Sequence, residues 1–442
     1  MTPSGSRGSD RIVALSGWVL AAMVALAITH GLVPSFPSWP AGVCAWLAGA
    51  LLLRFTRNTQ KALLAALIGL GGLAIIFAVS RGAVPEWIHL LDANVPLLAM
   101  IASVSFLRLV AGAPGASGPD GAELPVGRRA FRHTAFSVAF LGSFINISAP
   151  ILIGDRLAVE GRLSRFTSQS ITRVFSGCSA WSPFFGGMAV VLTYVSGAGL
   201  LSVMLAGLPF ALIGLTAVIV EAQLRYREEL AVFRGYPVSV SSLWVPVVLA
   251  ISVAIGSTIW PAVSILFIIA IAALSVSIVV LSVRTAPAKA ARTVSNHIRH
   301  GLPGMVGELL LFLGAGFLAV GLTAIVETGV IGLPMDQFTA PVAGALLAGI
   351  VAVSALGLHP VIAVAAVTPM LAPLNPSPVL LAVTYLYGWS LGTCASPLSG
   401  THLIFQGRYG TPSFRAAMWN WPYVLLMLGV GIGLLQWLAP GG

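Results

Sequence analysis

Long runs of apolar residues, separated by short polar segments, cover most of the chain. A membrane-spanning helix needs about 20 mostly apolar residues. Stretches of that kind recur from the N-terminus to the C-terminus, and they predict an all-α polytopic membrane protein with about 11 transmembrane helices. The expected spans are 12–29, 38–54, 62–79, 90–110, 170–195, 199–221, 242–260, 262–282, 304–326, 379–402 and 416–438.

Two further apolar regions do not fit a single span. Residues 131–158 are interrupted around Asn146, and residues 338–374 are too long for one helix and are interrupted at Gly357 and Pro360. Glycine and proline are poor material for a helix interior. We interpret each region as a re-entrant hairpin, which enters and leaves the membrane on the same side.

The basic residues support the two hairpins, because cytoplasmic loops of membrane proteins are enriched in Lys and Arg. With the N-terminus inside, and Arg108 counted at a cytoplasmic helix end, every Lys and Arg except Arg81 falls on the cytoplasmic side. If either region were an ordinary span, later basic loops would lie outside. We therefore expect the C-terminus outside and these segments inside: 1–11, 54–61, 111–133, 155–173, 222–236, 284–303 and 405–415.

This topology divides the chain into two similar halves. Each half reads as three helices, a hairpin, an interrupted helix and a last helix, and the two halves have opposite orientations in the membrane. The sequence therefore predicts two inverted-topology repeats. The expected boundaries are an extra N-terminal helix in 1–37, a first repeat in 38–221, a cytoplasmic linker in 222–241 and a second repeat in 242–438.

Composition strengthens the membrane assignment and excludes other classes. The 442 residues are 57% hydrophobic and 8% charged, with a mean hydropathy of +0.97, whereas soluble domains carry about 25% charged residues. The net charge of +10 comes from short loops, so we expect the lipid bilayer as a partner and no nucleic acid. The three cysteines form no metal-binding or disulfide pattern. The expected location is the bacterial cytoplasmic (inner) membrane.

Two short stretches interrupt predicted helices in the same way. Residues 177–187 read GCSAWSPFFGG and residues 392–402 read GTCASPLSGTH, and each contains Ser-Pro-x-x-Gly. Ser182 and Ser396 are 214 residues apart, about half the chain. One such motif alone would suggest a proline kink or close packing. Paired interruptions in opposed repeats, each after a hairpin, indicate a transport site near the middle of the membrane.

This layout resembles the ion transporter superfamily, which includes the divalent anion–sodium symporters and the NhaD- and ArsB-like carriers. The resemblance covers about 38–438. The symporters carry Ser-Asn-Thr at their hairpin tips and helix breaks, and this chain has no Ser-Asn-Thr. Its tips read GSFINIS at 142–148 and SALGLHP at 354–360. The resemblance also implies a homodimer.

Candidate site residues follow from the tips and the breaks. Serine, threonine and asparagine side chains offer hydrogen bonds to an anion and oxygen ligands to Na⁺. The expected substrate-binding residues are Ser143, Asn146, Ser148, Trp181, Ser182, Ser354, His359, Ser396 and Thr401. If Na⁺ is coupled, the expected ligands are Asn146, Ser179, Gly186, Ser354, Thr393 and Ser399. If a proton is coupled, the candidates are His359, which titrates near neutral pH in water, and Glu308.

The leading functional hypothesis is a secondary active transporter for a small organic anion, foremost a carboxylate, coupled to Na⁺ or H⁺ by alternating access. A cation/proton antiporter on the same fold is the alternative, and a channel is a weaker one. An integral membrane enzyme would need a convergent metal or nucleophile cluster, so we expect no enzyme. No cofactor other than Na⁺ is expected.

Overall fold

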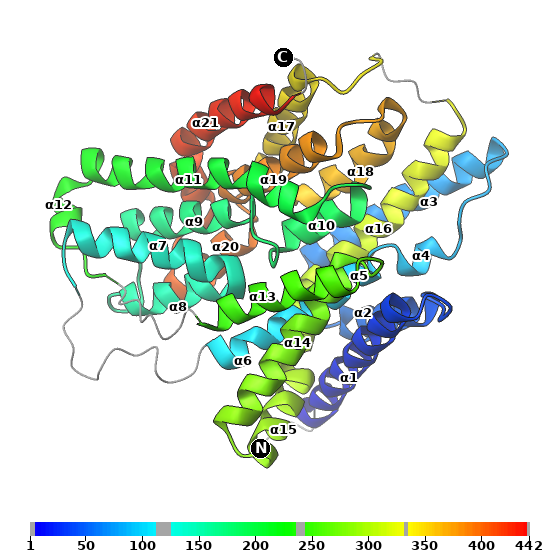
Figure 1. Cartoon of the computed structure of the whole chain (residues 1–442), viewed down its shortest axis with the longest axis horizontal. Coiled ribbons are helices and arrows are strands. Elements are labelled where there is room, and N and C mark those ends of the chain that lie inside the picture. Colours follow the sequence, from blue (N-terminus) through cyan, green and yellow to red (C-terminus); the bar gives the residue numbers. More distant parts are fainter. Residues whose placement is uncertain (1–4, 112–124, 236–243, 331–334, 440–442) are drawn as a thin grey trace. The chain divides into compact units, whose positions relative to one another are not determined.

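A computed structural model describes residues 5–111, 125–235, 244–330 and 335–439. These residues form helices and no strand, apart from isolated β-bridges between Val126 and Arg234 and between Val159 and Arg162 (Figure 1). Eight of the described helical segments are long and apolar enough to cross a membrane. Shorter apolar helices accompany them. The chain is an all-α polytopic membrane protein, as the hydrophobic pattern predicts.

The chain forms two compact units, each built from both halves of the sequence. Unit 1 comprises Met1–Ala113, Val245–Pro334 and Ala365–Pro373, and unit 2 comprises Pro114–Trp244, Met335–Val364 and Leu374–Gly442. Unit 1 therefore takes the first three helices of each predicted repeat, together with the extra N-terminal helix. Unit 2 takes the interrupted helix and the last helix of each repeat, the first hairpin, and the second hairpin except Ala365–Pro373, which belong to unit 1.

Unit 1 is a bundle of spanning helices. Within it, α3 packs against α16 and α5 packs against α14. Its elements are α1 (Gly5–Leu32), α2 (Trp39–Leu53), α3 (Asn58–Ser80), α4 (His89–Asp92), α5 (Val95–Val104), η1 (Ser105–Leu107), α6 (Arg108–Ala111), α13 (Trp244–Ile259, from Val245 on), α14 (Ile265–Arg284), α15 (Pro287–Asn296), η3 (His297–Gly301), η4 (Leu302–Met305), α16 (Val306–Glu327), and α18 (Pro360–Leu371) and η5 (Ala372–Leu374) from Ala365 to Pro373.

Unit 2 contains both hairpin tips and both interrupted helices. Its first part is α7 (Arg128–Ile145), α8 (Ser148–Leu157), α9 (Arg165–Cys178), α10 (Gly186–Tyr194), α11 (Leu200–Arg225) and α12 (Arg227–Ala231). Its second part is α17 (Ala340–Ala355), the start of α18 (Pro360–Leu371), the end of η5 (Ala372–Leu374), α19 (Pro378–Ala395), α20 (Gly400–Tyr409) and α21 (Ser413–Leu438).

The packing inside unit 2 follows a two-fold pattern. In the first half α7 and α11 both pack on α9, and in the second half α17 and α21 both pack on α19. The last helix of each half also packs on the interrupted helix of the other half, since α11 contacts α19 and α21 contacts α9. Two related halves would give this reciprocal packing. The inverted orientation of the halves in the membrane stays a prediction.

In each of the two predicted hairpin regions the chain forms two helices joined by a turn. In 131–158 the chain turns between α7 and α8 at Asn146, and in 338–374 it turns between α17 and α18 at residues 356–359. Their re-entry into a membrane stays a prediction. The predicted linker 222–241 is described up to residue 235, and its remainder and the C-terminal residue lie outside the described residues.

Two local features differ from what the sequence suggests. The basic segment 284–303 holds α15, a short helix, followed by the π turn η3. The predicted span 170–195 would place Arg173 near the start of the first interrupted helix, but α9 begins eight residues before it, at Arg165, so Arg173 lies inside the helix and is only 3% exposed.

Candidate functional site

The first interruption separates α9 from α10. Helix α9 ends at Cys178 and α10 begins at Gly186. Pro183 cannot donate a backbone hydrogen bond, so the helix cannot continue through it unchanged. The Ser182 hydroxyl donates to the carbonyl of Ser143 at the tip of the first hairpin and accepts the N–H of Phe184 at 3.2 Å. Ser182 therefore joins the first break to the first hairpin tip.

The second interruption uses the same device between α19 and α20. Helix α19 ends at Ala395 and α20 begins at Gly400. The Ser396 hydroxyl accepts the N–H of Leu398 at 3.3 Å, two residues onward, as Ser182 does in the first break. The Ser399 hydroxyl caps α20 by accepting the N–H of His402 at 3.4 Å. Both Ser-Pro-x-x-Gly motifs thus have the geometry that their sequence suggests.

Close packing holds the first hairpin tip on the first break. A Cβ atom on Gly142 would lie 3.0 Å from the Cys178 sulfur, a tight contact, so the tip and α9 approach closely there. The rings of Phe144 and Phe184 also meet, with centroids 5.4 Å apart. Asn146 turns the chain with a φ of +51°, an unusual value outside glycine. Among the described residues its side-chain amide has no hydrogen-bond partner.

The second hairpin tip packs on the end of α19. A Cβ atom on Gly392 would lie 2.6 Å from the Ser354 Oγ and 2.9 Å from Pro360, so α17 and α19 approach closely. Ser354 is 0% exposed, and its hydroxyl finds no hydrogen-bond partner among the described residues. Buried polar atoms in proteins are normally hydrogen-bonded. An unpartnered hydroxyl at this position is suited to bind a ligand.

Trp389 connects the second hairpin tip with the start of α10. Its ring meets the His359 ring edge-on, with centroids 4.8 Å apart and an interplanar angle of 83°. The same ring lies 3.1 Å from where a Cβ on Gly187 would stand. Sequence reasoning chose Trp181 as the aromatic site residue and missed Trp389. The signal available was the run of aromatic residues TYLYGWS inside a helix that needs only apolar residues.

His359 has a defined hydrogen-bonding role. Its Nδ1 accepts the N–H of Val361 at 3.3 Å, at the start of α18. The neutral ring therefore carries its proton on Nε2, which is left to donate. The structure brings His359 to the second tip, where the sequence placed it. Its proposed role in proton coupling stays a prediction.

Two of the predicted Na⁺ ligands keep oxygen lone pairs free, because the hydroxyls of Ser179 and Thr393 donate their protons to the carbonyls of Ser176 and Trp389 at 2.7 and 2.9 Å. A third, Gly186, begins α10. Among the predicted substrate-binding residues, the Ser143 hydroxyl donates to the Ala139 carbonyl at 2.8 Å, and Ser148 and Thr401 lie at the starts of α8 and α20.

Glu308 belongs to a different part of the chain. It is exposed in the first turn of α16, in unit 1, whereas every tip and break residue is in unit 2. Its predicted role stays untested. Across the described residues, no group of three or more His, Cys, Asp and Glu side chains is placed to hold a metal ion.

A buried arginine network, which sequence reasoning missed, adjoins the second break. Arg173 on α9 forms an ion pair with Glu221 on α11 and donates from Nη2 to the Trp419 carbonyl at 2.9 Å. Its Nε donates to the Asn420 Oδ1 at 2.8 Å. Asn420 in turn contacts His402 at 3.2 Å.

An exposed ion pair ties the first hairpin to α20. The Arg408 guanidinium binds both carboxylate oxygens of Asp155 at 2.6 Å, and the Tyr409 hydroxyl donates to Asp155 at 2.9 Å. The hydrogen bond from Arg408 holds the pKa of the Asp155 carboxyl below its ordinary value. A Cβ on Gly154 would lie 2.5 Å from the Tyr409 hydroxyl, so glycine makes room for this contact.

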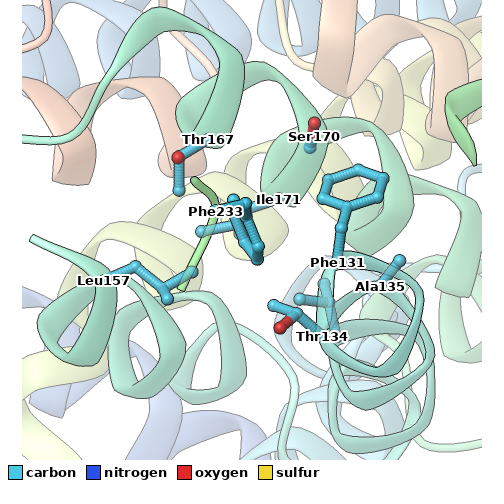
Figure 2. Close-up of a pocket in the computed structure, with 9 residues that line it drawn as sticks. Phe131, Thr134, Ala135, Leu157, Thr167, Ser170, Ile171 and Phe233 are labelled. Carbon is cyan, nitrogen blue, oxygen red and sulfur yellow. The ribbon is translucent and has the colours of Figure 1, made fainter. Parts of the chain in front are cut away.

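An apolar pocket lies behind the first hairpin rather than at its tip. Figure 2 shows the rings of Phe131 and Phe233 facing it, with α9 residues on another side. Its empty volume is about 240 Å³. Few polar groups face it, so it does not match the predicted anion site. Its lining residues are Phe131, Thr134, Ala135, Val138, Leu157, Thr167, Ser170, Ile171 and Phe233.

Comparison with solved structures shows a likeness to a membrane transporter. No protein-family model matches the chain, and no curated protein matches its sequence. The chain is similar to the crystal structure of the YdaH transporter from Alcanivorax borkumensis, described as having an unusual topology, with 16% identity, a TM-score of 0.44, and 87% of this chain and 88% of that chain covered. Because both the identity and the TM-score are low, we infer function from the geometry of unit 2.

Proposed function

We propose that this chain is a secondary active transporter that moves a small organic anion, foremost a carboxylate, coupled to Na⁺ or H⁺. The observation that carries the proposal is the pair of interrupted helices in unit 2, each with a hairpin tip packed on its break. Backbone groups without partners cost several kcal/mol in hydrocarbon. Such interruptions persist in membranes where they line a binding cavity.

The chemistry of the breaks favours an anion with a coupled cation. Helices α10 and α20 begin at the breaks, and helix N-termini offer free N–H groups and partial positive charge to an anion. The unwound carbonyls and nearby hydroxyls suit Na⁺. The unpartnered Ser354 hydroxyl adds a group that can donate a hydrogen bond to a carboxylate or coordinate a cation through its oxygen.

The carboxylates of unit 2 that lie beside the interrupted helices favour this proposal over a cation/proton antiporter. Asp155 is bound by Arg408 and Glu221 by Arg173. An antiporter generally needs a carboxylate that is free to exchange a cation for a proton. Both of these carboxylates already have cationic partners.

Uptake by purified protein in sealed proteoliposomes tests the proposal. Radiolabelled acetate, succinate and benzoate would be offered under imposed Na⁺, pH and voltage gradients. We expect at least one anion to accumulate above its external concentration under an inward Na⁺ or H⁺ gradient, and to leave when an ionophore collapses that gradient. Uptake that stops at equilibrium under every gradient would indicate a channel, and Na⁺–H⁺ exchange without anion movement would indicate an antiporter.

A further inference from the structure

The arginine network at the second break is a single chain of directional hydrogen bonds. Arg173, Asn420 and His402 are 3%, 1% and 0% exposed. They come from α9, α21 and α20. The hydrogen bonds therefore link one interrupted helix to the other through α21, the last helix. A buried polar network of this kind fixes geometry when every member is satisfied.

Each hydrogen bond in the chain fixes the next. The Arg173 guanidinium can only donate, so the Asn420 atom that it meets must be the amide oxygen. The Asn420 nitrogen then faces the His402 Nε2 at 3.2 Å and donates to it. A nitrogen that accepts carries no proton, so the neutral His402 ring holds its proton on Nδ1.

The series of hydrogen bonds ends at the backbone of the second break. His402 Nδ1 lies 2.8 Å from the carbonyl oxygen of Ser396, to which it donates. The same carbonyl accepts the N–H of Ser399 at 3.2 Å. Ser396 precedes Pro397, which ends the regular hydrogen bonding of α19. His402 therefore holds the carbonyl at the point where the helix unwinds.

We propose that His402, locked as its Nδ1–H tautomer by Arg173 through Asn420, is the positioning residue that keeps the second break in its unwound shape. That the break serves transport rests on the proposed function, whereas the positioning itself does not. Glu221 also belongs to this network, because its carboxylate forms an ion pair with the Arg173 guanidinium.

The first break is held differently, which supplies an internal control. The residue 214 positions before His402 is Met188, which has no ring nitrogen to donate. Instead, Gly207 of α11 lies directly on the first break, since a Cβ there would stand 1.7 Å from the Ala180 carbonyl oxygen. A change at His402 should thus act on the second break alone.

The tautomer can be read by NMR on the full-length protein with isotope-labelled histidine. Of the seven histidines, the one whose signal disappears in His402→Asn is His402. We expect that signal to show the proton on Nδ1, and to lose this signature in Asn420→Asp, whose carboxylate cannot donate to Nε2. A wild-type His402 signal with the proton on Nε2 would overturn the proposal.

Hydrogen–deuterium exchange of the second break then tests the positioning. The side-chain amide nitrogen of asparagine is as many bonds from Cα as His Nδ1, whereas that of glutamine matches Nε2. His402→Gln should speed exchange of the Ser399 amide roughly five- to tenfold, and His402→Asn should leave it near the wild-type rate. Residues 177–187 should be unchanged in both. Equal effects of both variants would contradict the proposal, and neither readout requires a transported substrate.

Discussion

Replacing Ser354 with alanine should make the protein more stable and a poorer transporter. The Ser354 hydroxyl is fully buried and has no hydrogen-bond partner among the described residues. A buried polar group left unsatisfied costs about 1–3 kcal/mol. Ser354→Ala removes that cost with a small change in volume. The same hydroxyl is proposed to bind the ligand, so the variant should lose one of its hydrogen bonds.

The two effects can be measured separately. Half-lives of thermal inactivation in detergent without substrate should lengthen about fivefold for a gain of about 1 kcal/mol. Affinity for a transported anion should fall roughly 10- to 150-fold, because a hydrogen bond to a charged group contributes about 1.5–3 kcal/mol.

Thr172→Val is the matched control. Thr172 is also 0% exposed, and within the described part of the chain its hydroxyl has no hydrogen-bond partner. It lies on α9, outside both tips and both breaks. Thr172→Val should stabilise the protein similarly and leave anion affinity unchanged. If Ser354→Ala instead destabilised the protein, or if it transported with wild-type affinity, the assignment of Ser354 to the ligand site would be wrong.

Three further predictions concern other residues of unit 2. Ser182→Ala and Ser396→Ala should each lower transport while expression stays normal, with the larger loss of stability in Ser182→Ala, which alone breaks a bond to a hairpin tip; equal unfolding temperatures would argue against this difference. If His359 carries the coupled proton, His359→Gln should abolish pH-driven accumulation and keep anion exchange, whereas unchanged pH-driven uptake would remove His359 from coupling. Gly207→Ala should cost about 1–3 kcal/mol or more by overpacking the first break, while Gly429→Ala on α21, where nothing lies within 4 Å, should be neutral.

Most of the helical layout follows from one-dimensional patterns. Apolar length predicts spanning helices, and proline with glycine predicts where they stop, so the turns within 131–158 and 338–374 and both breaks lie where the sequence places them. The tip and break of each half meet for a related reason, since they follow one another along the chain. Ser182 thus contacts Ser143 at the first tip.

Contacts between distant segments could not be derived in this way. Trp389 meets His359 only because α17 and α19 pack through Gly392, and no local pattern marks that approach. The hydrogen bonds between Arg173, Asn420 and His402 join three helices. Taken one at a time in the sequence, these residues look like a cytoplasmic anchor of a helix, a polar residue and a histidine at a helix end. Directional hydrogen bonds reveal their roles only once the partners are in place.

A structure with a transported anion bound tests the central claim most directly. We expect the anion to lie between the hairpin tips, 142–148 and 354–360, and the breaks, 177–187 and 392–402. Ser354 should be among the residues that contact it. A position more than one helical turn, about 5.4 Å, from both breaks would contradict the account.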